Sequence, residues 1–93
     1  MFYLVVYDIP SDKLRTELAD ALLSFGERVQ ESVFECDLRQ AGEYDRMLTR
    51  IKMLINADKG DAVRIYRLCG DCLPKTVILG EGHLTQDADL III

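Results

Sequence analysis

The sequence predicts a small α+β domain, because short apolar strands alternate with amphipathic helices along 93 residues that contain no repeat and no linker. Residues 2–8 form an apolar run of strand length, and residues 43–55 carry apolar side chains at helical spacing. Hydrophobic residues make up 49% of the chain and charged residues 29%, a balance typical of a folded globular protein and not of a disordered one. We therefore expect one domain over residues 1–93.

The first strand and the first helix follow each other closely. In "FYLVVYD", residues 2–8, apolar side chains occupy both faces, as in a central strand that is covered on two sides. One face carries Phe2, Leu4, Val6 and Asp8, and the other carries Tyr3, Val5 and Tyr7. Pro10 ends the strand, and Ser11 or Asp12 can cap a helix over residues 12–26. Its apolar stripe consists of Leu14, Leu18, Ala21, Leu22 and Phe25.

The remaining elements are predicted from the same periodicities. Residues 28–38, "RVQESVFECDL", alternate as one strand with one wetter face, and residues 41–60 form the clearest helix, ended by Lys59–Gly60. Further strands are expected over residues 61–68, 75–80 and 87–93. We interpret this series as a ferredoxin-like βαββαβ sandwich with an extra C-terminal strand.

This arrangement predicts a homodimer. Two helices cover only one face of such a sheet, and the apolar first strand requires cover on the other face as well. A second copy related by a two-fold axis is the simplest cover. Residues 88–93, which include "LIII", are expected to form a strand that pairs with the partner protomer.

Composition restricts the location and the partners. The start has no basic region before its apolar run, which argues against a signal peptide. No apolar run approaches the roughly 18 residues that a membrane helix needs. Three cysteines, an odd number, favour free thiols in a reducing cytoplasm. The net charge of −5 argues mildly against a polyanionic partner, although the basic residues could still gather on one face around a metal ion. We expect a cytoplasmic protein without membrane contact.

Asp8 is the most informative single residue, since an apolar strand ends on this acid directly before Ile9 and Pro10. It could stabilise the turn before the helix, or it could hold a divalent cation such as Mg²⁺, which needs only one or two protein carboxylates. The residues alone leave both interpretations open.

Three stretches resemble the CRISPR-associated Cas2 family, the small integrase partner of spacer acquisition: "YDIPSDKLR", "GERVQESVFECDL" and "VRIYRL". The most specific of them contains "RVQESVFE", and the likeness extends from residue 1 to about residue 80. The resemblance implies a dimer whose last strand joins the partner's sheet, and a role in bridging dimers of the Cas1-family integrase while holding DNA. It also implies a Mg²⁺-dependent nuclease on single-stranded RNA or double-stranded DNA, with Asp8 as the metal-binding and catalytic carboxylate.

The resemblance extends to nucleic-acid contacts. Lys13, Arg15 and Arg28 are the candidate phosphate-binding residues, with solvated surface as the alternative for each. Leu14 separates Lys13 from Arg15, where many family members carry adjacent basic residues, and this weakens the expectation of nuclease activity. Ser32 and Phe34 match positions near the presumed cleft, with core packing the stronger interpretation for Phe34.

Several functions therefore remain open. The acidic charge and the divided basic pair favour a dimeric scaffold over a vigorous nuclease. The alternatives are a ribonuclease toxin of the virulence-associated type and a non-catalytic interaction dimer. The pair Cys69 and Cys72 is weak evidence for zinc or redox chemistry, because it lacks a second ligand pair and "LP" is expected to lead into a strand.

Overall fold

The computed structural model describes residues 1–83. In this part of the chain the elements follow the order βαββαβ, which confirms the predicted fold class. They are β1 (Phe2–Asp8), α1 (Asp12–Leu22), β2 (Glu27–Gln30), β3 (Val33–Asp37), α2 (Glu43–Leu54) and β4 (Ala62–Leu68). The four strands described form an antiparallel sheet in the order β2-β3-β1-β4, with β1 in its interior.

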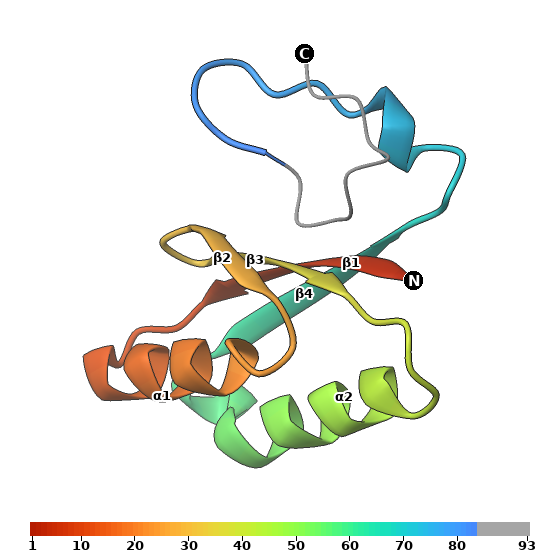
Figure 1. Cartoon of the computed structure of the whole chain (residues 1–93). Coiled ribbons are helices and arrows are strands. Elements are labelled where there is room, and N and C mark those ends of the chain that lie inside the picture. Colours follow the sequence, from red (N-terminus) through yellow and green to blue (C-terminus); the bar gives the residue numbers. More distant parts are fainter. Residues whose placement is uncertain (84–93) are drawn as a thin grey trace.

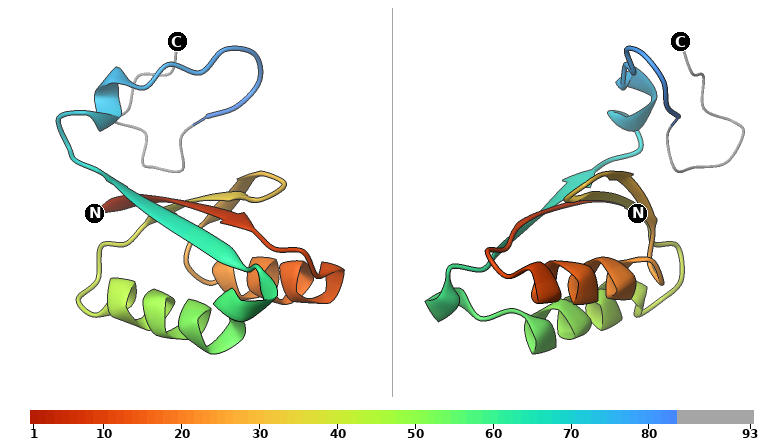
Figure 2. Two further views of the ribbon diagram at one scale, coloured as in Figure 1. Left: turned by 180° about the vertical axis from the view of Figure 1, so that it is seen from behind. Right: turned by 90° about the vertical axis from the view of Figure 1, so that its left-hand side faces the viewer.

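The molecule has a helical layer and a sheet layer, and residues 69–83 extend beyond the sheet. Both helices lie against the same face of the sheet, whereas residues 69–83 lie on the opposite side (Figure 1; Figure 2, right). This arrangement matches the expectation that the two helices leave the second face of the sheet to be covered by something else.

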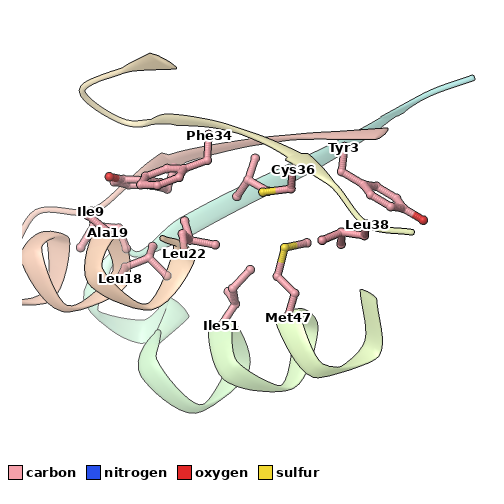
Figure 3. Packing of buried hydrophobic residues seen from close by; sticks show 12 residues of the cluster. Tyr3, Ile9, Leu18, Ala19, Leu22, Phe34, Cys36, Leu38, Met47 and Ile51 are labelled. Carbon is pink, nitrogen blue, oxygen red and sulfur yellow. The ribbon is translucent and has the colours of Figure 1, made fainter. Parts of the chain in front are cut away.

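The core lies between the helices and the sheet (Figure 3). Val5 and Phe34, which are register partners on β1 and β3, are fully buried. Tyr3 stacks on Tyr44 of α2 with ring centroids 4.5 Å apart. The buried cluster is completed by Tyr7, Ile9, Leu18, Ala19, Leu22, Cys36, Leu38, Met47 and Ile51. The predicted helical stripes are thus the surfaces that the helices bury.

The helix boundaries follow from local capping. Ser11 precedes α1, and its Oγ accepts a hydrogen bond from the backbone N–H of Leu14 at 3.3 Å, as predicted for an N-cap. α2 ends at Leu54, earlier than predicted, and a short 3₁₀ helix over Ala57–Lys59 follows. Gly60 closes that helix with φ of 85°, a conformation that glycine adopts without strain. Neither α-helix in residues 1–83 has the length and apolar character needed to cross a bilayer.

The prediction of one strand over residues 28–38 is wrong, because this segment is a hairpin. Its two strands produce the βαββαβ order, whereas the elements predicted one by one over residues 1–80 run β-α-β-α-β-β. Gln30 pairs with Val33, and Glu31 and Ser32 form the turn between β2 and β3. The register also shifts between Arg28 and Gln30. The alternation of polar and apolar residues breaks at the polar run Gln30–Glu31–Ser32, and the turn forms at this break.

The prediction of a strand over residues 75–80 is also wrong. Leu73–Lys75 form a 3₁₀ helix, and the described residues after it belong to no strand. Ile78 instead packs with Leu73 against Phe2 and Leu68 in a small second cluster. An extended segment becomes a strand only where a neighbouring edge supplies hydrogen bonds. The further strand predicted over residues 87–93, including the pairing segment 88–93, lies outside the described residues.

Candidate functional site

A cavity of about 560 Å³ lies where β1 ends and α1 begins, beside the turn of the β2–β3 hairpin. Two segments that are distant in sequence meet there: the continuous stretch from the end of β1 into α1, and the hairpin turn, which lies beside β1 because β1 pairs with β3. The lining residues are Tyr7, Asp8, Ile9, Asp12, Arg15, Thr16, Ala19, Asp20, Arg28, Glu31 and Ser32. The structure therefore brings Asp8, Arg15, Arg28 and Ser32 together.

Asp8 is the last residue of β1 and pairs in register with Ala62 of β4. The pairing with β3 stops earlier, at Val6 and Val33, so Asp8 extends past the start of β3. Strand alternation places its side chain on the sheet face opposite to the helices. Asp8 is exposed, and within residues 1–83 no hydrogen bond or ion pair holds its carboxylate. This carboxylate is available for a ligand.

Arg15 holds the turn between β1 and α1. Its Nη1 donates hydrogen bonds to the carbonyl oxygens of Ile9 at 2.7 Å and Pro10 at 3.2 Å, and its Nη2 forms an ion pair with Asp12. The side chain is nevertheless 40% exposed. A guanidinium has five N–H donors, so these contacts leave part of the group for a phosphate.

Arg28 and Tyr7 fix the hairpin turn next to Asp8. The carbonyl oxygen of Glu31 accepts hydrogen bonds from the Tyr7 hydroxyl at 3.0 Å and from the Arg28 Nε at 2.8 Å, and the Arg28 Nη2 also contacts it. The Tyr7 backbone N–H donates to the Ser32 carbonyl at 3.1 Å. The Arg28 side chain is thus exposed at the cavity, and its hydrogen bonds to the hairpin turn at Glu31 fix its orientation.

Lys13 and Phe34 lie apart from this cavity. Lys13 is 88% exposed on its side chain, forms an ion pair with Glu17 at 4.0 Å, and lines a separate depression near the end of α2. Phe34 is fully buried and lies behind Tyr7, with ring centroids 6.3 Å apart. Phe34 therefore borders the cavity through Tyr7 and, as the register partner of Arg28, through β2.

The acidic side chains of the cavity suit a cation that takes few of its ligands from the protein and the rest from water or substrate. Four acidic side chains, those of Asp8, Asp12, Asp20 and Glu31, line it with two arginines. Within residues 1–83 there is no group of three or more His, Cys, Asp or Glu residues placed to enclose a metal ion. Mg²⁺ accepts one or two carboxylates with waters and substrate phosphates as the other ligands. The exposed Asp8 fits that requirement as a single ligand.

The Glu31 carbonyl and the Tyr7 hydroxyl belong to the site but were not predicted from the sequence. Both depend on the hairpin turn, which places Glu31 beside the end of β1. The polar run Gln30–Glu31–Ser32 between two valines was the available signal for a turn.

Comparison with known proteins identifies the family. Residues 1–76 match the family described as "CRISPR associated protein Cas2". The chain is 45% identical to a "CRISPR-associated endoribonuclease Cas2 1" of Chloroflexus aurantiacus over 94 aligned residues, which cover 98% of this chain and 100% of the relative.

Solved structures agree with this match. The crystal structure of Streptococcus pyogenes Cas2 at pH 6.5 has a TM-score of 0.73 and 29% identity, covering 86% of this chain and 100% of that one. A chain of a partial Cas6-RT-Cas1–Cas2 complex has a TM-score of 0.71 and 28% identity, covering 84% of this chain and 89% of that one. The sequence match over most of the chain and the shared fold show that the protein belongs to the CRISPR-associated Cas2 family.

Proposed function

We propose that this protein is a subunit of the CRISPR spacer-acquisition machinery, in which a homodimer forms a scaffold for a Cas1-family integrase and for the DNA to be inserted. Family membership over residues 1–76 is the observation that carries this proposal. The similar chain in a complex with Cas1 supports the choice of partner.

The dimer is supported by the sheet face that the helices leave free. Leu4 and Val6 point to this face and remain half-buried in a single chain. Beyond the second cluster, Val77 is 62% exposed and Leu79 is 89% exposed. A second copy on this face would bury these apolar side chains and would bring the two Asp8 residues toward one another.

A second candidate function is the hydrolysis of phosphodiester bonds in RNA or duplex DNA with a divalent metal. The exposed, unpaired Asp8 at a cavity with Arg28 supports it. Asp8 would hold the ion, and the N–H groups of Arg28 that do not bond Glu31 would position a phosphate. A bound Mg²⁺ would polarise a phosphoryl oxygen and lower the pKa of a coordinated water.

The two functions can be separated with Asp8→Ala, tested beside the wild type and the exposed control Asp58→Asn. Each protein is assayed for cleavage of single-stranded RNA and duplex DNA with Mg²⁺, and for support of integration by the integrase from the same locus. We expect Asp8→Ala to lose cleavage by roughly 100-fold or more, because a metal ion supplies several kcal/mol of transition-state stabilisation. Integration should stay within about twofold of wild type, a change well below 1 kcal/mol.

Each result has a defined meaning. Wild-type protein that fails to bind the integrase or to support integration would contradict the scaffold function. Cleavage that persists in Asp8→Ala would contradict the assignment of Asp8 to the metal. Sedimentation equilibrium on the wild type tests the dimer separately, and a stable single subunit would contradict it.

A further inference from the structure

Two cysteines, Cys69 and Cys72, occupy the turn that follows β4. The segment that begins with this turn, residues 69–83, lies on the side of the sheet away from the helices (Figure 1). The backbone N–H groups of Cys72 and Leu73 both donate to the Cys69 carbonyl oxygen at 3.1 Å. A turn closed by such a bond brings the first and fourth Cα atoms within about 7 Å, and a disulfide spans about 4.4–6.8 Å between Cα atoms. The backbone is already folded for this bond.

Both thiol groups are accessible, and the two cysteines lie in one hydrogen-bonded turn. Both cysteines are free and exposed, and a Cβ placed on Gly70 between them would meet no atom within 4 Å. The neighbouring Cys72 thiol lowers the pKa of Cys69, and Cys69 in turn raises the pKa of Cys72. The backbone N–H groups of Asp71 and Cys72 lower the Cys69 pKa further. Cys69 is therefore the better nucleophile of the pair.

Cys36 provides an internal contrast. It is fully buried on β3, and burial together with the charge of Glu35 raises its pKa to about 12. A thiol of this kind packs as a small apolar side chain and reacts slowly. The structure thus separates one inert thiol from a reactive pair.

The structure also removes the sequence-based objection to redox chemistry at this pair. The segment after Cys72 was expected to continue into a strand, whereas Leu73–Lys75 form a 3₁₀ helix. The cysteine pair consequently lies between β4 and a short 3₁₀ helix, and the strand expected after it does not form in residues 75–80.

We propose that Cys69 and Cys72 are a redox modification site that forms a reversible intramolecular disulfide by exchange with small-molecule disulfides such as oxidised glutathione. The Cys69 thiolate attacks one sulfur of glutathione disulfide, whose S–S bond breaks and releases one glutathione thiolate. The Cys72 sulfur, after losing its proton to solvent, attacks Cys69 in the mixed disulfide and releases the second glutathione. The protein loses two electrons and two protons, and the glutathione disulfide gains them as two thiols.

The disulfide would act on the segment that covers one end of the open sheet face. Leu73 directly follows the pair and is buried against Phe2, and Ile78 joins the same cluster. His83, farther along, lies 3.9 Å from Glu27 of β2. Closing the turn covalently restricts the start of residues 73–83 and so favours their packed position on the sheet.

To test this, the full-length protein is equilibrated in glutathione buffers that range from fully reduced to fully oxidised. The reaction is then quenched with acid, the remaining free thiols are alkylated, and the products are identified by intact mass measurement and peptide mapping. The variants are Cys69→Ser, Cys72→Ser and, as the control, Cys36→Ala. Wild type and Cys36→Ala should lose the mass of two hydrogen atoms and yield a disulfide between residues 69 and 72. Cys72→Ser should accumulate a single glutathione adduct on Cys69. Hydrogen exchange of residues 73–83 should slow on oxidation, relative to α2.

Several results would overturn this proposal. Wild type that carries separate glutathione adducts on both cysteines, or that forms no internal disulfide in the fully oxidised buffer, excludes the pair as a disulfide site. Glutathione adducts that are equally abundant on Cys36 and Cys69 would contradict the proposed difference in reactivity between the buried and the exposed thiols. Stoichiometric zinc that is retained by wild type and lost from both serine variants would assign the pair to metal ligation. Unchanged exchange of residues 73–83 would contradict the effect on that segment.

Discussion

The two faces of β1 differ although both are built from apolar side chains. On the helix side, Tyr3, Val5 and Tyr7 are buried by contacts within the chain. On the other side, Leu4 and Val6 remain half-buried, and the strand ends on the exposed Asp8. Within residues 1–83 the core is thus complete on the helix side, whereas on the other side only the start of β1, at Phe2, is buried, under the segment after β4. The other face carries the features that concern function: the candidate metal ligand, the expected dimer surface and the reactive thiols.

The largest effect is expected from removing a side chain on the helix side. Phe34→Ala leaves a cavity beneath Tyr7 in the fully buried core and should lower the free energy of unfolding by about 3–5 kcal/mol. Leu79→Ala, on the open side and 89% exposed in the single chain, should change it by less than about 0.5 kcal/mol when the protein is dilute enough to be a single subunit. Urea unfolding measures both. Equal losses in the two variants would show that the faces do not differ in packing.

An intermediate effect is expected from replacing a glycine by alanine, which adds one methyl group, in the packed region at Gly26 but not in the open turn at Gly70. A Cβ on Gly26 would lie 2.3 Å from the Glu35 carbonyl oxygen and 2.8 Å from the Cys36 Cα, so β3 would have to shift. Gly26→Ala should therefore cost about 1–3 kcal/mol. Gly70→Ala meets no neighbour within 4 Å and should be nearly neutral. Thermal unfolding of both variants tests this contrast, which a neutral Gly26→Ala would refute.

The smallest effect is a pH dependence that belongs to the buried thiol. Burial, with a contribution from Glu35, raises the pKa of Cys36 to about 12, whereas in the unfolded chain the thiol ionises near its ordinary value. Above that ordinary value the unfolded state binds fewer protons, so the free energy of unfolding falls as pH rises toward 12.

The measurement is urea unfolding of wild type and Cys36→Ala at about pH 8 and about pH 10. The decrease between these pH values should be about 1.4 kcal/mol larger for wild type. The thiol of the unfolded chain ionises near the middle of this interval, and each pH unit above its pKa lowers the free energy of unfolding by about 1.4 kcal/mol for one proton. Identical decreases would show that Cys36 is solvated in the folded state. The exposed pair at residues 69 and 72 contributes to both proteins and cancels in the comparison.

The apolar periodicity was sufficient for the fold class and for most of the core. The stripes of both helices and the alternation of β1 depend on neighbours three, four or two positions away, and such local patterns are visible in a sequence. Asp8 was recognised for a similar reason, since a strand that ends on an acid before proline is a local feature, and the family resemblance then gave it an expected role.

The tertiary structure decided what depends on distant neighbours. Whether residues 28–38 form one strand or a hairpin depends on pairing with β1, and whether residues 75–80 form a strand depends on a free sheet edge. Lys13 and Arg15 separate because positions two apart on a helix point in nearly opposite directions, and only Arg15 faces the cavity. Hydrogen-bond partners and buried neighbours are set by the packing of the whole chain, which no local pattern contains.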